Sequence, residues 1–405
     1  MAQRIYITGT GLISALGNNT EENLTALLEE RSGIGQITLL NTIHKGKFPI
    51  AEVRLSNEEL LDRLGLPKKT NLTRTAMLGM IAAREALDSA GIRDMKNVRT
   101  GLISATTVGG MDRSELFYEK FLTDNKKGRL RDVVNHDCGD STERIADYTG
   151  IHEFITTIST ACSSSLNSIA FGAELIRAGL VDRVLAGGTD SVTKFTLNGF
   201  NTLMILDKNN CRPFDETRAG LTLGEGAAYV VLESEQQVKK ENKPVLCELT
   251  GYGNANDAYH QTASSPEGIG AFMAMQKALQ MSGLKPGGID YINVHGTGTS
   301  NNDLSEGIAI ERLFGDDVPA FSSTKSYTGH TLGAAGAVET VISILSMRNH
   351  VIFPNLNFST PMKELKIVPV TMLRQDAEIR NVLTNSFGFG GNNSTLILSM
   401  VDSLQ

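Results

Sequence analysis

Short runs of apolar and β-branched residues recur along the chain, and most of them lead directly into glycine. These runs cover residues 4–11, 99–110, 183–192, 227–234, 291–299 and 394–401. Longer stretches between them carry apolar side chains at the 3.6-residue spacing of a helix and end at or near a glycine; they cover residues 74–91, 162–179 and 270–285. Strands that alternate with helices across glycine turns predict an α/β fold.

The two halves of the chain share part of this pattern. Residues 6–17 and 248–260 each combine a strand-like run with the motif Thr-Gly-x-Gly, and a helical stretch follows each. Those helical stretches end similarly, in LDSAG at Gly91 and in LQMSG at Gly283. We therefore predict an internal duplication whose seam lies in a charged, linker-like stretch. The expected halves are residues 1–245 and 246–405, and the seam is residues 235–246.

Composition places the chain among ordinary globular proteins. Of its 405 residues, 40% are hydrophobic and 20% are charged, and the net charge of -7 does not favour a nucleic-acid partner. No apolar run is long enough for a membrane span, and the N-terminus lacks the pattern of a signal peptide. Cys138, Cys162, Cys211 and Cys247 are widely spaced and form no CxxC pair, which favours reduced thiols. We expect a cytoplasmic protein.

The glycines near the N-terminus resemble a dinucleotide-binding turn. Gly9 and Gly11 follow a strand-like run, but Ser14 occupies the place of the third glycine. No convincing acidic residue follows a second strand at the expected distance of about 20 residues. We therefore favour a tight turn here over a nicotinamide-cofactor site.

Cys162 lies where a strand-like run, FITTIST, meets the helical stretch that begins CSSSLNS. A helix N-terminus favours a thiolate through its partial positive charge and free N–H groups. The backbone N–H of Cys162 could also help to hold an oxyanion. Its small neighbours Ala161, Ser163 and Ser164 leave room for a substrate. The alternative is a buried structural cysteine.

Two of the seven histidines stand in similar surroundings. His295 follows a strand-like run and His330 precedes a Gly/Ala-rich helix start, and Gly, Thr and Ser flank both. Lys325 lies five residues before His330. A cysteine with two imidazoles can activate a nucleophile and bind a carbonyl oxygen on which charge develops. A zinc site is the rival interpretation, although these residues lack short-range ligand spacing.

Phenylalanine and glycine alternate before the last strand-like run. Phe387 and Phe389 lie in NSFGFGGNN, where glycines could let a backbone N–H point into a cavity that a ring closes. The same pattern is also typical of a hairpin turn with packed aromatic rings.

Five motifs in this order resemble the elongating β-ketoacyl-[acyl-carrier-protein] synthases, close to type II, of the thiolase superfamily. They are TACSSSLNSI, CRPFDETRAGLTLGEGAA, VHGTGT, STKSYTGHTLGAAGAVE and NSFGFGGNN. The resemblance covers essentially the whole chain. It implies a thiolase-like five-layered α-β-α-β-α fold built from two duplicated halves, usually as a homodimer. It also implies that no cofactor is needed, because acyl carrier protein presents both substrates on its phosphopantetheine arm.

The resemblance implies a two-stage Claisen condensation. Cys162 would take the acyl group from carrier protein, with its own N–H and that of Phe389 as the oxyanion hole. His295 and His330 would hold the malonyl thioester during loss of CO2. Lys325 would support the electrostatics and orient His330, paired with an acidic residue, Glu339 or Glu306.

Further positions carry over from the family one by one. Thr297 and Thr299 match residues that bind the phosphopantetheine arm, and Asp303 and Glu306 match an acidic pair that follows the first His motif. Substrate-site matches are an acyl gate, pocket walls and a polar pair near the mouth: Phe389, Phe387, Val108, Asp257 and His260. A monovalent-cation site of some members is matched by Asn293, Glu339, Asn385 and Ser386.

Carrier protein is acidic, so basic clusters on this chain are candidates for docking it. The alternative is that they are ordinary solvated surface. The clusters consist of Lys68, Lys69, Arg74, Lys126, Lys127 and Arg129.

The chain departs from the family near the entrance and the gate. It has Gly390-Gly391-Asn392-Asn393 where the family usually has GGTN, and Arg218-Ala219-Gly220-Leu221 where the family usually has RDGF. These changes leave substrate preference open, so a ketosynthase of a polyene, polyketide or unusual lipid pathway is an alternative. A degradative thiolase would need a second catalytic cysteine, but none follows Cys247. A catalytically silent chain-length partner would lack the nucleophile, and Cys162 opposes that interpretation.

Overall fold

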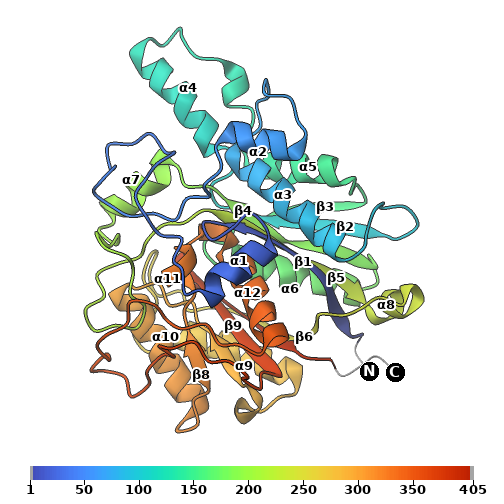
Figure 1. Cartoon of the computed structure of the whole chain (residues 1–405), viewed down its shortest axis with the longest axis vertical. Coiled ribbons are helices and arrows are strands. Elements are labelled where there is room, and N and C mark those ends of the chain that lie inside the picture. Colours follow the sequence, from blue (N-terminus) through green and yellow to red (C-terminus); the bar gives the residue numbers. More distant parts are fainter. Residues whose placement is uncertain (1–2, 402–405) are drawn as a thin grey trace.

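The computed structural model describes residues 3–401 and shows a mixed α/β fold around one continuous ten-stranded sheet (Figure 1). The strand order is β3-β2-β4-β5-β1-β6-β10-β9-β7-β8. The first five strands are β1 (Ile5–Ser14), β2 (Thr100–Ala105), β3 (Phe154–Ile158), β4 (Arg183–Asp190) and β5 (Gly226–Ser234). The other five are β6 (Cys247–Asn256), β7 (Tyr291–Asn293), β8 (Ala320–Ser322), β9 (Asn381–Gly388) and β10 (Asn392–Ser399).

The two halves of the sheet have the same topology. In the first, β1 pairs antiparallel with β5, β5 antiparallel with β4, β4 parallel with β2, and β2 parallel with β3. In the second, β6, β10, β9, β7 and β8 repeat those pairings in the same sequence. The halves join through a short antiparallel contact in which Tyr6 faces Glu248 and Ile7 faces Cys247. The duplication predicted from the sequence is confirmed at the level of topology.

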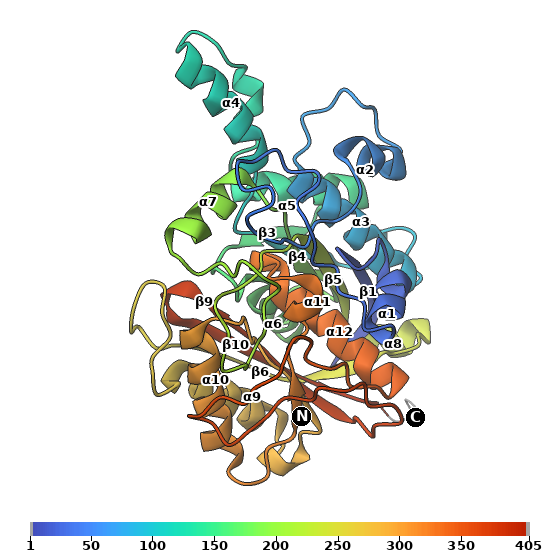
Figure 2. The ribbon, with the colours of Figure 1, turned by 60° about the vertical axis from the view of Figure 1, so that its left-hand side comes forward.

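Helices cover both outer faces of the sheet and fill the space between its halves. Helices α3 (Arg74–Ser89) and α5 (Cys138–Thr149) pack on the outer face of the first half. Helices α6 (Ser164–Arg177) and α12 (Ala335–Asn349) lie between the halves, and α9 (Ile269–Ser282) and α10 (Ser300–Phe314) cover the second (Figures 1 and 2). The expected α-β-α-β-α layering is therefore confirmed.

The remaining helices lie around this core. They are α1 (Thr20–Leu28), α2 (Asn57–Leu64), α4 (Met111–Thr123), α7 (Lys194–Thr202), α8 (Glu235–Glu241) and α11 (Lys325–Thr328). Helix α4 projects from the body in both views and buries none of its own residues (Figures 1 and 2). Helix α8 occupies the stretch that we expected to be a linker. No helix within residues 3–401 is long and apolar enough to cross a membrane.

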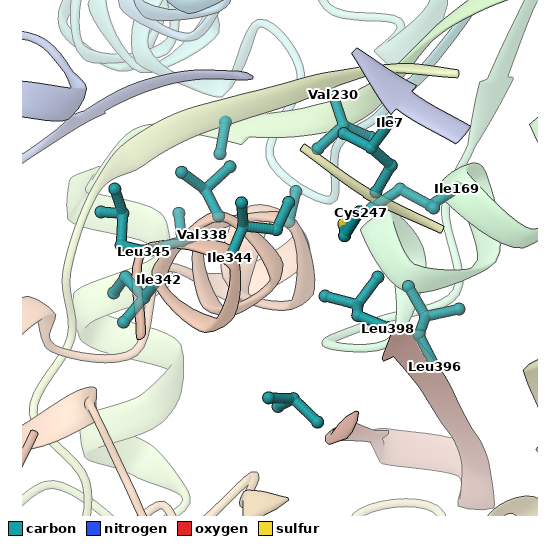
Figure 3. Close-up of a cluster of buried hydrophobic side chains, with 14 of the residues drawn as sticks. Ile7, Ile169, Val230, Cys247, Val338, Ile342, Ile344, Leu345, Leu396 and Leu398 are labelled. Atoms are coloured by element: carbon teal, nitrogen blue, oxygen red, sulfur yellow. The ribbon is translucent and has the colours of Figure 1, made fainter. Parts of the chain in front are cut away.

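Side chains along each strand point alternately to the two faces of the sheet, and this explains why the central helices α6 and α12 are buried from both sides. In β5, Ala228, Val230 and Leu232 face the central helices, while the intervening side chains face α3. In β10, Leu396 and Leu398 face the same central layer from the other half (Figure 3). Helix α12 is consequently buried on all sides from Ala335 to Met347, and this central layer carries both Cys162 and the loop of His330.

The Thr-Gly-x-Gly motifs serve helix packing. A Cβ on Gly11 of β1 would lie 2.0 Å from the carbonyl oxygen of Ala82 in α3. A Cβ on Gly253 of β6 would lie 2.2 Å from the carbonyl oxygen of Ala274 in α9. Each motif thus lets a helix backbone lie directly on its strand. This close approach accounts for the glycines that resembled a dinucleotide-binding turn.

Candidate active site

Cys162 lies at the elbow between β3 and α6, two residues before the helix begins. Its predecessor Ala161 has a φ of +54°, a left-handed conformation that is uncommon for a residue with a side chain. The Ser386 hydroxyl donates a hydrogen bond to the carbonyl oxygen of Cys162 at 2.8 Å, which ties the elbow to β9. The expected strand-to-helix position of the thiol is confirmed, and the thiol is 7% exposed.

His330 contacts the thiol directly. Its Nε2 lies 3.1 Å from Cys162 Sγ, and its Nδ1 accepts a hydrogen bond from the N–H of Leu332 at 3.1 Å. Because Nδ1 is an acceptor, the proton of the neutral ring resides on Nε2. The N–H of His330 therefore points toward the sulfur and the space beside it.

His295 is fixed in the same tautomer by a different partner. Its Nδ1 lies 3.2 Å from the ammonium of Lys325, which can only donate, so the ring proton again resides on Nε2. The Lys325 ammonium also forms a fully buried ion pair with Glu339. We expected Lys325 to orient His330; that prediction is wrong, since Lys325 contacts His295. The pairing of Lys325 with Glu339, one of the two expected alternatives, is confirmed.

Burial sets the protonation states of this cluster. Desolvation and the Lys325 charge hold the pKa of His295 and that of His330 well below the ordinary value, so both rings are neutral near pH 7. Burial also raises the pKa of the Cys162 thiol to about 11, although Lys325 and the N–H groups of Phe389 and Cys162 oppose that shift. The sequence argument for a thiolate at a helix N-terminus underestimated this desolvation.

The cluster also has the ligand types of a metal site. One ligand atom from each of Cys162, His295 and His330 lies within 4.8 Å of the others. The sequence spacing gave no sign of this proximity, because the fold brings the three residues together from separate segments. The Lys325 ammonium beside His295 adds positive charge to the cluster, which opposes a divalent cation.

Two buried carboxylates shape the loop that carries His295. Glu306 accepts hydrogen bonds from the N–H groups of His295 and Gly296, both at 2.8 Å, and burial raises its pKa to about 7. Asp303 accepts from the N–H of Thr297 at 2.8 Å and from that of Gly298. The predicted acidic pair thus supports the loop through its backbone.

A narrow pocket of about 110 Å³ opens in front of the thiol. Thr297 and Thr299 line it, with their hydroxyls 2.9 Å apart, and Phe387 packs against the His295 ring at a centroid distance of 6.0 Å. The backbone N–H groups of Phe389 and of Cys162 itself both act to lower the pKa of the Cys162 thiol, which indicates that both lie near Sγ. Their role as a pair of oxyanion donors stays a prediction.

The ring of Phe389 closes this pocket against a partner that sequence reasoning missed. Phe200 of α7 stacks on Phe389 with ring centroids 5.9 Å apart. Phe200 lies in no recognised motif, so only the tertiary structure could identify it. Phe389 itself lies in the short 3₁₀ turn Phe389–Gly391 between β9 and β10.

Three other predicted substrate residues do not line this pocket. Asp257 and His260 belong to a loop that holds the gate, since the N–H of Asp257 donates to the carbonyl oxygen of Gly391 at 3.2 Å. Val108 is buried in an apolar cluster that also contains Leu221, and Leu221 lines the pocket. Its role as a wall of the acyl pocket stays a prediction.

A second missed residue, Asp190, connects Val108 to the catalytic loop. This fully buried carboxylate accepts hydrogen bonds from the N–H of Val108 at 3.0 Å and from the N–H of Gly333 at 2.7 Å. Gly333 is three residues after His330. A lone Asp at the end of a strand gives no sequence signal of such a bridge.

The predicted cation site fits a cation only in part. Both side-chain polar atoms of Asn293 and the Oε2 atom of Glu339 are buried without a hydrogen-bond partner among the described residues. Such oxygens suit a hard cation. In contrast, Asn385 Oδ1 accepts a hydrogen bond from the Thr395 hydroxyl at 2.7 Å, and the Ser386 hydroxyl donates to the carbonyl oxygen of Cys162. Asn293 and Glu339 are the members of the set that could hold an ion.

The basic clusters are mostly exposed, with one exception. Lys68, Lys69, Lys126, Lys127 and Arg129 lie on the surface, as a docking role requires. Arg74 is buried and forms an ion pair with Glu225, with further hydrogen bonds to the carbonyl oxygens of Val53 and Leu55. The prediction that Arg74 takes part in docking is therefore wrong.

Comparison with known proteins agrees with this geometry. Residues 2–238 match the model of the N-terminal domain of β-ketoacyl synthase, and residues 246–359 match that of its C-terminal domain. A 3-oxoacyl-[acyl-carrier-protein] synthase 2 from Coxiella burnetii is 36% identical, with 98% of this chain and 99% of that protein covered.

Solved structures give the same picture. The ishigamide ketosynthase/chain length factor superposes with a TM-score of 0.92 at 31% identity, covering 99% of this chain and 100% of that one. A type II ketosynthase AntDE, solved with its acyl-carrier protein AntF, superposes with a TM-score of 0.89 at 25% identity, covering 99% and 100%. Together with the Cys-His-His-Lys cluster, these matches show that the chain belongs to the β-ketoacyl synthase family.

Proposed function

We propose that the chain is a 3-oxoacyl-[acyl-carrier-protein] synthase that elongates fatty acyl groups. The observation that carries this proposal is the pairing of a buried thiol with two neutral imidazoles, whose Nε2–H groups point toward the space at the sulfur where a substrate oxygen would lie. The family membership, and a relative named for this reaction that matches along its whole length, support it.

In the first stage, Cys162 Sγ attacks the thioester carbonyl of an acyl-carrier protein. The bond between that carbonyl and the carrier sulfur breaks, and the thiol proton leaves with the carrier's phosphopantetheine thiol. The N–H groups of Cys162 and Phe389, which both lie near Sγ, receive the negative charge on the carbonyl oxygen. The acyl group remains on Cys162.

In the second stage, the thioester oxygen of malonyl-carrier protein accepts hydrogen bonds from His295 and His330. The bond to the malonyl carboxylate breaks, CO2 leaves, and the electron pair is held as an enolate. Its carbon attacks the acyl carbonyl on Cys162, the bond to Sγ breaks, and the Cys162 thiolate that leaves takes up a proton from solvent. Neutral imidazoles suit this task because they donate to the enolate oxygen, and a dry pocket strengthens each bond.

The chain itself supplies the nucleophile and all the donors, so we propose that the reaction needs no dissociable cofactor. Thr297 and Thr299 would bind the phosphopantetheine arm, and Lys68, Lys69, Lys126, Lys127 and Arg129 would meet the acidic carrier protein. A monovalent cation between Asn293 and Glu339 is a further proposal. It would satisfy oxygens that otherwise lack partners.

We also propose that the chain forms a homodimer through the edge strand β3. This strand ends the sheet, and exposed apolar side chains lie beside it, with Ile155 at 39% and Phe171 at 40% exposure. At the other end of the sheet, the N–H of Val370 already donates to the carbonyl oxygen of Phe321 in β8. An open apolar edge is a site where a second chain pairs.

A ketosynthase of a specialised polyene, polyketide or unusual lipid pathway is the second candidate. Its support is the close superposition on a ketosynthase/chain length factor and the changed residues near the gate. Competition among acyl-carrier proteins of graded chain length would distinguish the two candidates. A strong preference for one unusual acyl group would favour the specialised pathway.

The proposed function is tested by the two half-reactions. Intact-mass measurement after incubation with acyl-carrier protein should show an acyl adduct on the wild type and none on Cys162→Ala. His295→Ala should keep that adduct but release CO2 from malonyl-carrier protein at least about 100-fold more slowly, the usual effect of losing one oxyanion donor. Absence of an adduct on a folded wild type would refute the enzyme assignment. Undiminished CO2 release by His295→Ala would refute the role of that residue.

A further inference from the structure

One side-chain oxygen lies where three segments meet: the gate turn Phe389–Gly391, the elbow around Cys162, and strand β6. The Oδ1 atom of Asn392, the first residue after the gate turn, accepts a hydrogen bond from the Ser163 hydroxyl at 2.7 Å. It also accepts from Nδ2 of Asn167 in α6 at 3.0 Å and from Nδ2 of Asn254 in β6 at 2.9 Å. Ser163 directly follows the nucleophile Cys162.

The backbone of the gate lies against the same elbow. A Cβ on Gly388 would lie 2.9 Å from the carbonyl oxygen of Thr160 and 3.2 Å from the N of Cys162. On its far side, the turn is held by the N–H of Gly390, which donates to the carbonyl oxygen of Gln261 at 2.8 Å. Asn392 is therefore the side chain that joins the end of the gate to the nucleophile's own segment.

The chemistry of this junction favours an amide or carboxylate oxygen. All three neighbours can donate, and Asn392 Oδ1 lies within hydrogen-bond distance of each. The Ser163 hydroxyl carries one proton and also lies 2.8 Å from the carbonyl oxygen of Thr160, so the two oxygens share that donor. The Thr that the resembling family usually carries here has a hydroxyl one bond nearer the backbone, so it would not occupy the position of Asn392 Oδ1.

The gate must open for the reaction to proceed. The pocket in front of Cys162 measures about 110 Å³ with Phe389 stacked on Phe200, whereas pockets that hold sizeable ligands occupy roughly 300–1,000 Å³. The same turn must then close again, because the N–H of Phe389 is an oxyanion donor only when it faces Sγ. The stability of the closed position therefore affects both access and chemistry.

We propose that Asn392 is a positioning residue that latches the closed gate to the nucleophile elbow and so sets how readily bulky acyl groups reach Cys162. This role rests on the proposed function, in which Phe389 gates an acyl-binding pocket. Loss of the Asn392 oxygen would leave three donors without their common acceptor and shift the gate toward its open position.

The test is the selectivity of Cys162 alkylation, measured without any carrier protein. Rates of modification by small iodoacetamide and by bulky N-pyrenylmaleimide are followed by intact mass, and their ratio reports gate opening. Asn392→Ala should raise the bulky-to-small ratio roughly tenfold, since it removes a hydrogen-bonded junction. Asn392→Asp retains an acceptor oxygen and should keep the wild-type ratio.

Ser394→Ala is the matched control, since Ser394 donates to Asn167 Oδ1 at 2.6 Å in the same network without contacting Ser163. It should keep the wild-type ratio. If Asn392→Ala does not fold, Asn392→Thr should shift the ratio in the same direction. An unchanged ratio in the folded variant, or an equal rise in Ser394→Ala, would overturn the proposal. The ratio does not depend on condensation, so a failure of this proposal can be distinguished from a failure of the proposed function.

Discussion

At the scale of single residues, the site places a weakly acidic thiol among groups that favour its ionised form. Burial raises the pKa of Cys162 to about 11, whereas Lys325 and two backbone N–H groups act in the opposite direction. The site therefore holds a thiol at rest, and its preorganised donors act when charge develops on a substrate oxygen. Such an arrangement stabilises the transition state more than the resting nucleophile.

The pH dependence of Cys162 alkylation tests this balance. The raised pKa means that the thiolate fraction grows as the pH rises, so the iodoacetamide rate should still be increasing at pH 9.5. The same cysteine in protein unfolded by guanidinium is the control, and its rate should level off above a pKa of about 8.5. A plateau near pH 7 in the folded protein would show that His330 and the helix end overcome burial.

Sequence reasoning could identify the catalytic residues but not all of their partners. Cys162, His295, His330 and Lys325 each lie in a motif of small residues that is ambiguous alone, and the order of the five motifs resolved the ambiguity through the family resemblance. Which carboxylate pairs with Lys325, and which histidine it contacts, depends on side-chain directions in the folded core. Arg74 shows the same limit, because nothing in its sequence context reveals that Glu225 buries it as an ion pair.

At the scale of elements, the glycine motifs show how local sequence fixes the layers. A strand that carries Gly-x-Gly allows its covering helix to approach backbone to backbone, and the chain uses this arrangement once in each half. The Gly-x-Gly pattern was visible in the sequence, but its role in helix packing was not, because the same motif also occurs in nucleotide-binding turns. Seven longer helices were not named from the sequence: α1, α2, α4, α5, α7, α8 and α10.

Alanine substitution tests this packing role. Gly11→Ala and Gly253→Ala should each lower the free energy of unfolding by about 1–3 kcal/mol, because the new methyl group overlaps a helix carbonyl oxygen. Chemical denaturation followed by circular dichroism would measure the change. Gly287→Ala is the control, since no atom lies within 4 Å of its Cβ position, and its stability should stay near that of the wild type. Equal stability of all three variants would show that each helix can shift away from its strand with little loss of unfolding free energy.

At the scale of the whole molecule, the two ends of the sheet differ. Strand β8 is covered by the segment that contains Val370, whereas β3 ends the sheet beside exposed Ile155 and Phe171. Phe171 also packs against Phe154 of β3, with ring centroids 6.3 Å apart, whereas Ile155 points to the opposite face of the same strand. The duplication implied that the two halves would repeat the same strand pairings. The difference between the two ends of the sheet depends on which loops return to cover each edge strand.

This difference predicts the oligomeric state. If two copies pair through β3, light scattering after size exclusion should give about twice the chain mass of 43.7 kDa for the wild type. Ile155→Glu would bury a carboxylate at the interface, which is strongly unfavourable, and should give the single-chain mass. Met372→Glu changes an apolar residue that is 76% exposed near the covered end of the sheet, so that control should remain dimeric. A wild type that is monomeric alone and pairs only with a different ketosynthase-like chain would refute the homodimer. The β3 edge would then be assigned to a heterologous partner.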